Sequence, residues 1–211
     1  MKTAAGYEAE SALREALVGN MSQAKQQAQA ALALSNGRDV ETVSAIALGL
    51  AGDSAQATRL AADLAKRFPE DTIVQFVCLP MIHAAAALQG GSATKVIEAL
   101  APTAPYELGT PAQVLTGFTL YPVYLRGEGY VAAHQGSAAA AEFQKILGHP
   151  GVVLNEPIGA LTHFSLARAY TLSGENAKAR AAYQDFFALW KDADPDIPIL
   201  KEAKAEYAKL Q

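Results

Sequence analysis

A turn made of a glycine and a following polar residue recurs five times along this chain of 211 residues. Each turn separates two runs in which apolar residues return three and four positions apart, the spacing of one face of an α-helix. Glycine can take the left-handed conformation that ends a helix, and the polar side chain after it can cap the next one. The alternation that is typical of a strand is not found. The chain is therefore predicted to be all-α, with helices paired by the turns Gly19-Asn20, Gly52-Asp53, Gly91-Ser92, Gly136-Ser137 and Gly174-Glu175.

The composition supports closely packed helices and excludes several classes of protein. Alanine supplies 45 residues, and it is the best helix former and small enough to let helices approach. With 51% apolar and 18% charged residues, the chain is too apolar to be disordered. One cysteine excludes a disulfide scaffold and a thiolate zinc cluster. A net charge of −4 argues against nucleic acid as the partner. No apolar run reaches the roughly 18 residues of a membrane span, so no direct membrane insertion is expected.

Motifs for catalysis, metal binding and secretion are missing from the sequence. There is no glycine-rich phosphate loop, no Gly-x-Ser-x-Gly elbow and no His-x-x-x-His pair. The sequence therefore predicts no catalytic residues, no metal and no cofactor, and a protein that is not an enzyme. Glu8, Glu10 and Glu15 come too early for a secretory signal peptide. A cytoplasmic location is the default expectation, and a periplasmic one applies if the chain follows a membrane segment in a longer protein.

The run from residue 166 to 186 resembles a tetratricopeptide repeat. It has that family's order of large, small and aromatic residues around a turn glycine, carried by Leu166, Ala167, Tyr170, Gly174, Ala179, Tyr183 and Phe186. In such a repeat the small residues lie where two helices cross, and the large ones fill the space beside them. Four earlier stretches match the same spacing more loosely, with helix-crossing anchors at Ala24, Ala57, Val96 and Ala139.

This resemblance covers nearly the whole chain and implies a right-handed α–α solenoid of about five helix pairs. The pairs are expected at about 4–35, 39–69, 72–101, 120–148 and 160–192, in a single domain. Inserted segments at 101–120 and 148–160 are rich in proline and glycine. A C-terminal capping helix is expected at 196–210, with its charged residues exposed to solvent: Lys201, Glu202, Lys204 and Glu206.

Several local stretches are also similar to the carboxy-terminal repeat region of certain bacterial serine/threonine protein kinases. They are residues 64–72, 104–108, 120–127, 155–159 and 190–198. The resemblance implies a regulatory or sensing region, because the kinase glycine loop, His-Arg-Asp loop and Asp-Phe-Gly site have no counterpart.

In tetratricopeptide solenoids the first helix of each pair lines a concave groove. Positions three before and one after each small crossing residue are expected to face it. These positions, with one aromatic a turn earlier, give the groove candidates Thr42, Ile46, Met81, Tyr121, Tyr124, Glu128, Phe164 and Arg168. Aromatic side chains beside an arginine are typical anchors of a peptide-binding surface. In the alternative interpretation the aromatics pack the inserted loops, and Glu128 pairs with Arg168 at the surface.

The sequence thus predicts a non-catalytic domain that binds a protein or peptide segment in its groove. Two alternatives stay open. The first is a structural solenoid that forms a homodimer through its first helix, using Tyr7, Ala9, Ala12 and Leu13. The second is a helical small-ligand-binding protein that uses Tyr121, His163, Glu128 and Arg168 in a closed pocket.

Overall fold

The computed structural model describes residues 2–109 and 118–210, and within these ranges every regular element is helical. The prediction of an all-α chain is confirmed there. Twelve α-helices are found in the described ranges. They are α1 (Lys2–Leu17), α2 (Met21–Leu34), α3 (Arg38–Leu50), α4 (Ser54–Arg67), α5 (Leu79–Gln89), α6 (Ala93–Leu100), α7 (Tyr121–Ala132), α8 (Gly136–Leu147), α9 (Pro150–Val153), α10 (Pro157–Leu172), α11 (Asn176–Leu189) and α12 (Pro198–Ala208).

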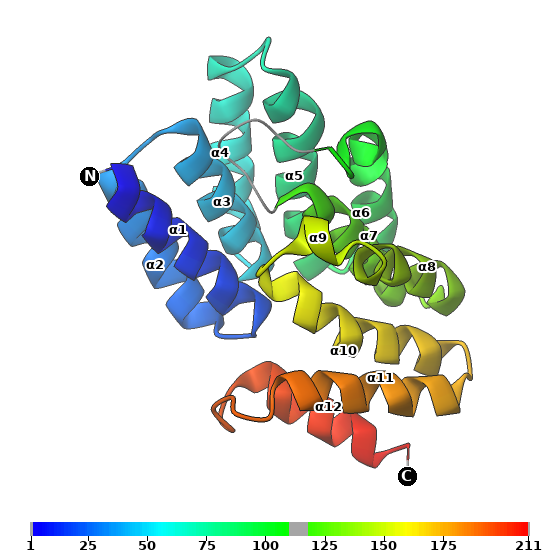
Figure 1. The fold of residues 1–211 in the computed structure, drawn as a ribbon. Helices are drawn as coiled ribbons and strands as arrows, with labels where there is room; N and C mark the ends of the chain where they lie inside the picture. The colour runs from blue at the N-terminus through cyan, green and yellow to red at the C-terminus, as the bar shows by residue number, and fades with distance from the viewer. Residues whose placement is uncertain (1, 110–117, 211) are drawn as a thin grey trace.

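The helices pack in sequence order as successive pairs (Figure 1). The pairs are α1/α2, α3/α4, α5/α6, α7/α8 and α10/α11, and each pair packs on the next. The first helices of neighbouring pairs also contact one another, from α1 through α3, α5 and α7 to α10. A row of contacting first helices is thereby formed, and it extends from one end of the chain to the other.

The turns within the pairs follow the predicted chemistry at four positions and depart from it at one. Gly19, Gly52, Gly91 and Gly174 all have positive φ, as a glycine that ends a helix does. In the fourth pair the positive φ of 56° belongs to His134, and Gly136 instead opens α8. A Cβ at position 136 would lie 2.5 Å from the Ala169 carbonyl oxygen. Gly136 is therefore required by the close approach of α8 to α10, and the prediction that it forms the turn is wrong.

Side-chain capping is less general than the turn pattern predicts. Asp53 caps α4, because its Oδ1 accepts a hydrogen bond from the Gln56 amide at 3.1 Å. The N-cap residues Asn20, Ser92 and Glu175 make no such bond. Asn20 instead donates through Nδ2 to Glu15 Oε2 at 2.7 Å. The glycines therefore matter more than the polar residues for these turns.

The third pair begins with a π-helical turn, Val74–Cys78, that continues directly into α5. Asp71 caps this turn, since its Oδ1 accepts from the amides of Ile73 and Val74, each at 3.0 Å. Pro80 follows in the first turn of α5, where it cannot donate a backbone hydrogen bond. The π-helical turn thus ends directly before the proline-containing first turn of α5.

The segment after α6 is held by a buried ionic cluster. It begins as a 3-10 helix, Ala101–Tyr106, and the Glu107 side chain beyond it is almost fully buried. Glu107 pairs with Arg126 of α7 at 2.5 Å and with Lys145 of α8. A second 3-10 turn, Phe118–Leu120, leads into α7. The described part of the inserted segment is thereby fixed to α7 and α8.

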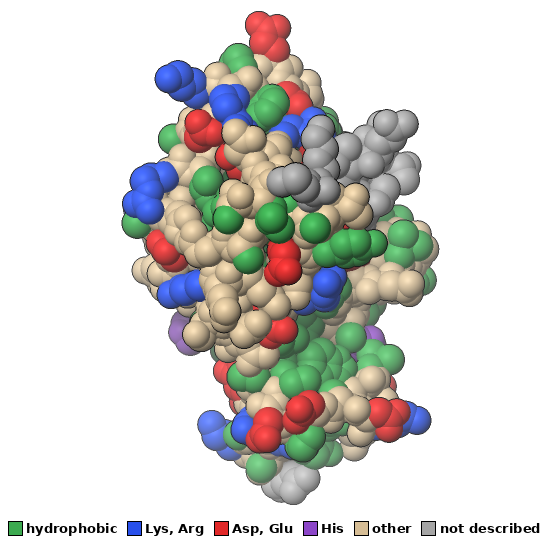
Figure 2. Space-filling model, turned by 90° about the vertical axis from the view of Figure 1, so that its left-hand side faces the viewer, with side chains coloured by type: hydrophobic (Ala, Val, Ile, Leu, Met, Phe, Trp, Pro, Cys, Tyr) green, Lys and Arg blue, Asp and Glu red, His purple; other side chains and the backbone are tan. Residues whose placement is uncertain are grey.

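The last helix meets the first turn of the chain. The Ile199 amide of α12 donates to the Val18 carbonyl oxygen at 3.2 Å. A Cβ at Gly19 would lie 2.9 Å from Pro198 Cβ, so the two segments are in close contact. Seen from the side, hydrophobic side chains gather where the body of the molecule narrows toward its lower, C-terminal end (Figure 2). The α1–α2 turn and α12, from opposite ends of the chain, are therefore in contact.

The first helix uses its apolar face within the chain. Ala9, Ala12 and Leu13 are buried in the core, and only Tyr7 of the four residues named for a dimer face is exposed, at 66%. The prediction that this face is free for pairing is wrong, because α1 packs against both α2 and α3. Among the described helices, none combines the length and apolar character that crossing a membrane requires.

Close helix packing can be tested at Gly127, in the middle of α7. A Cβ there would lie 2.5 Å from the ring of Phe143, which is fully buried in α8. Gly127→Ala is expected to lower the free energy of unfolding by about 1–3 kcal/mol, because the ring must move in a filled core. The measurement is urea unfolding followed by circular dichroism.

Gly6→Ala is the matched control for this variant. Gly6 lies inside α1, and a Cβ there meets nothing within 4 Å. This variant is expected to gain up to about 1 kcal/mol from helix propensity alone. Equal stabilisation of both variants would show that the α7–α8 contact is loose.

Candidate functional site

A pocket of about 210 Å³ lies where the first helices of all pairs converge with α12. It is lined by the ends of α1, α3 and α5, by the start of α2, by α7 and α10, and by the first two turns of α12. The α1–α2 turn and α12, which touch each other, close the pocket on one side. Each of the five helix pairs thus contributes residues to a single site.

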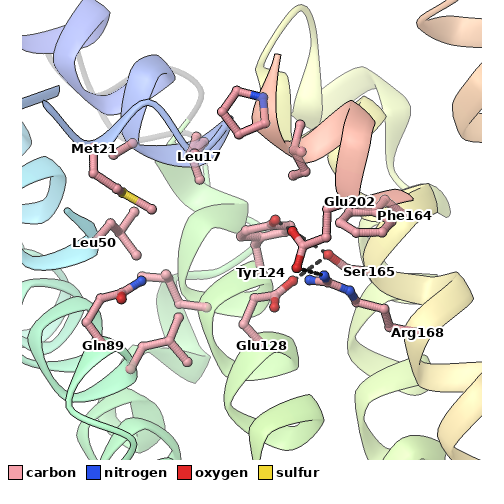
Figure 3. Close-up of a pocket in the computed structure, with 16 residues that line it drawn as sticks. Leu17, Met21, Leu50, Gln89, Tyr124, Glu128, Phe164, Ser165, Arg168 and Glu202 are labelled. Atoms are coloured by element: carbon pink, nitrogen blue, oxygen red, sulfur yellow. Dashed lines mark hydrogen bonds and ion pairs between the residues drawn. The ribbon is translucent and has the colours of Figure 1, made fainter. Parts of the chain in front are cut away.

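The two sides of the pocket differ in chemistry (Figure 3). One side is apolar and comes from the first three pairs: Leu17, Met21, Leu50 and Leu88. The other side is polar and comes from α7, α10 and α12: Glu128, Ser165, Arg168 and Glu202. Gln89, at the end of α5, adds an exposed amide beside the apolar side. A molecule in this pocket would therefore meet hydrocarbon on one side and charge on the other.

Glu128 and Ser165 form the centre of the polar side. The Ser165 hydroxyl donates to Glu128 Oε1, and the Tyr124 hydroxyl lies 3.5 Å from the same serine oxygen. Burial raises the pKa of Glu128, and the hydrogen bonds from Ser165 and Tyr124 and the charge of Arg168 offset this only in part. Burial likewise raises the pKa of Tyr124, so its hydroxyl stays protonated. The partners of the Glu128 carboxylate thus do not fully compensate its burial.

Arg168 is held by two carboxylates of α12. It donates to Glu206 through Nε at 3.0 Å and through Nη2 at 2.7 Å, and its Nη2 lies 2.5 Å from Glu202. Its guanidinium stacks over the Phe164 ring at 4.0 Å from the centroid. The Tyr183 hydroxyl also donates to Glu206, at 2.7 Å. These contacts fasten α12 to α10 and α11 and use most of the donors of Arg168.

The titration of Glu206 follows from these bonds. Burial raises its pKa, but the hydrogen bonds from Arg168 and Tyr183 outweigh burial, so the pKa lies below its ordinary value. The prediction that Glu206 is exposed is wrong, because the residue is half-buried in that cluster. Glu202 is exposed as predicted, although it also pairs with Arg168.

The groove candidates from the second half of the chain divide into two groups. Four of them line the pocket: Tyr124, Glu128, Phe164 and Arg168. The side chains of Tyr124 and Phe164 are almost fully buried. Tyr121 does not line it, since its ring is buried and its hydroxyl donates to Glu156 at 3.0 Å. Arg168 pairs with Glu202 and Glu206, so the expected surface pair between Arg168 and Glu128 is replaced by contacts to α12.

The candidates from the first half are not surface residues. Thr42, Ile46 and Met81 have no exposed area, and none lines the pocket. They lie in the interfaces of α3 and α5 with their neighbours. The prediction that they face a groove is wrong, because α3 and α5 reach the pocket only with their last turns, at Leu50 and Leu88.

Six residues that line the pocket were not among the groove candidates: Leu17, Met21, Leu50, Gln89, Ser165 and Glu202. For Ser165 a signal exists, since it is a polar residue within the apolar run of α10. For Leu50 and Gln89 the signal is their place in the last turn of a first helix. Nothing local identifies Glu202, because its role depends on where α12 folds back.

In the alternative interpretation the groove aromatics pack against the inserted loops, of which the segment 101–120 is one. Its described residues lie against α7 and α8 through Glu107 and do not line the pocket, and residues 110–117 lie outside the described ranges. The cover that is found comes from α12 and the α1–α2 turn.

Groups of three or more His, Cys, Asp or Glu side chains that could hold a metal ion are not found among the described residues. His163, named for a closed ligand pocket, lies 3.8 Å from Asp185 and does not line this one. Comparison with models of known protein families, with curated proteins and with solved structures finds no match to this chain. The interpretation of the pocket therefore rests on its own geometry.

The attachment of α12 can be tested at Glu206. Glu206→Gln keeps the shape but removes the charge that accepts from Arg168, so the free energy of unfolding at pH 7 is expected to fall by about 1–3 kcal/mol. Because the pKa of Glu206 is lowered in the folded state, its stabilisation is complete above the ordinary value of 4.5 and is lost as the pH falls through the lower folded value. The difference between wild type and variant should therefore shrink in acid, measured by urea unfolding between pH 7 and pH 3.

Glu202→Gln serves as the control, since this carboxylate is 56% exposed and pairs with the same arginine. Its effect is expected to stay within about 1 kcal/mol. If the two variants lose equal stability, Glu206 is not the main attachment of α12.

Proposed function

We propose that this chain is a non-catalytic protein-interaction domain, a right-handed solenoid of tetratricopeptide type that binds a segment of a partner protein. The order of packing supports the proposal, because each pair packs on the next and the first helices contact one another in a row. The small residues at the predicted crossings, such as Ala57, Ala139 and Ala179, are buried where two helices meet.

The observation that carries this proposal is the pocket shared by all five pairs and α12. The pocket takes residues from the first helix of all five pairs, and in solenoids the first helices line the face that binds extended partners. Its volume of about 210 Å³ is below the roughly 300–1,000 Å³ of typical small-molecule sites. A single anchoring side chain fits this size, while the rest of the partner segment lies outside.

We further propose that the domain is the regulatory carboxy-terminal region of a bacterial serine/threonine protein kinase. Its support is the local sequence similarity at 64–72, 120–127 and 190–198, and no contact in the structure adds to it. Mapping the complete reading frame tests it directly. A glycine-rich loop, a His-Arg-Asp loop and an Asp-Phe-Gly motif upstream are expected, and a frame without them would contradict the proposal.

Partner binding can be tested by filling the pocket. Random twelve-residue peptides displayed on phage are selected on the wild-type protein, and the selected peptides are synthesised for titration. Gln89→Trp puts a large side chain at an exposed position on the pocket rim. The variant is expected to weaken the selected peptides at least about tenfold, since an anchor pocket carries much of the binding energy.

Gln26→Trp is the matched control, because Gln26 is an exposed residue of α2 that does not line the pocket. It should leave the affinity unchanged. Failure to select any peptide, or equal loss in both variants, would contradict peptide binding at this pocket.

A further inference from the structure

The polar side of the pocket carries more negative than positive charge. Glu128 and Glu202 line it together with Arg168, and Glu206 lies directly behind the arginine. Arg168 already donates through Nε and Nη2 to the two carboxylates of α12. An anionic group that entered the pocket would therefore meet two lining carboxylates, Glu128 and Glu202, and an arginine that is already paired.

A purely apolar side chain is also a poor occupant. It would fill the space beside Leu17 and Leu50 but would remove water from the Glu128 carboxylate. Burial of a carboxylate is costly unless its partners compensate, and Ser165, Tyr124 and the charge of Arg168 compensate the burial of Glu128 only in part. The occupant that satisfies both sides has a flexible hydrocarbon stem and a cationic end.

Lysine meets these requirements better than arginine does. Its ammonium has three donors that can reach separate acceptors, whereas the flat guanidinium binds best to one carboxylate with both oxygens available. Glu128 has one oxygen occupied by Ser165, and Glu202 is engaged by Arg168. The remaining acceptor oxygens are on Glu128, Glu202 and Gln89, which belong to three different helices. The three N–H donors of an ammonium can point to acceptors in different directions.

We propose that the pocket receives the side chain of a lysine on the partner protein, with the stem against Leu17, Met21 and Leu50 and the ammonium at Glu128. This inference rests on the proposed function and specifies the anchor residue of the partner. Lysine commonly lays its methylene stem along apolar surface while its charged end stays at polar groups. The pocket thus selects a basic segment, in agreement with the net charge of −4 of the whole chain.

Small probes test the chemistry of the pocket without a partner. The probes n-butylammonium, n-butanol and pentanoate share a four-carbon chain and differ in the charge of the end group. Titration followed by NMR is expected to show saturable binding of n-butylammonium to the wild type, and at least about tenfold weaker binding of pentanoate. Glu128→Gln should weaken n-butylammonium at least about tenfold, the scale of one charge-assisted hydrogen bond, and leave n-butanol unchanged.

The variant is expected to fold, and a matched control is available. Because burial raises the pKa of Glu128, its ionised form costs stability at neutral pH, and glutamine can accept the same bond from Ser165. Glu98→Gln removes the same charge from an exposed position on α6 outside the pocket. It should leave all three probes unchanged. Equal loss of n-butylammonium binding in both variants would overturn the inference.

Selected peptides test whether the cation comes from a protein. Replacing their lysine by norleucine keeps the stem and removes the ammonium, so binding to the wild type should fall at least about tenfold. The same replacement should cost little on Glu128→Gln, because the two changes remove the same interaction. If the affinity losses from norleucine and from Glu128→Gln add up instead, the role of Glu128 is overturned.

The remaining outcomes separate this inference from the proposed function. Peptides that lose affinity on Gln89→Trp but tolerate norleucine would overturn the lysine anchor and leave peptide binding intact. Binding of n-butylammonium by a protein on which no peptide can be selected would overturn both the partner and the lysine, since the cation would then be a free amine.

Discussion

The structure depends on how closely its helices approach. At Gly49, Gly127 and Gly136 a single added carbon would come within 3 Å of atoms in a neighbouring helix. Alanines lie at several other crossings, and many have no exposed area. The pairs follow one another along a curved row (Figure 1). Residues that carry no chemistry of their own thus determine how closely the helices of this row pack.

That curvature explains why the site lies where it does. The row bends enough for the Gly19 turn to meet Pro198, so the concave side narrows to a pocket. In a straighter array of the same helices, Leu17 and Leu50 would be far from Glu128 and Arg168. The apolar side of the pocket comes from the first three pairs and the charged side from α7, α10 and α12, and the fold brings the two together. The proposed lysine anchor depends on this meeting, because neither wall by itself selects a basic side chain.

The parts of the molecule that sequence could predict are those determined locally. Helical spacing and turn glycines predict the paired helices, and the small residues at the crossings are visible in the spacing of Ala57, Ala139 and Ala179. Four residues of the candidate site, Tyr124, Glu128, Phe164 and Arg168, were identified because α7 and α10 pass the pocket with their middle turns. Thr42, Ile46 and Met81 were misplaced because the same spacing from the small crossing residue was assumed to face the groove in every pair. How α3 and α5 are oriented toward the pocket depends on how the pairs pack on one another, and no local sequence pattern predicts it.

Helix α12 determines which charge the inner face presents. With this helix in place, Glu202 and Glu206 neutralise Arg168 and leave Glu128 in excess. Were α12 to detach, Arg168 would remain on α10, stacked on Phe164 and without these two carboxylates. The same surface would then carry one carboxylate, Glu128, and one arginine, so its excess of negative charge would be gone. The position of one short helix thus decides whether this face is acidic or balanced in charge.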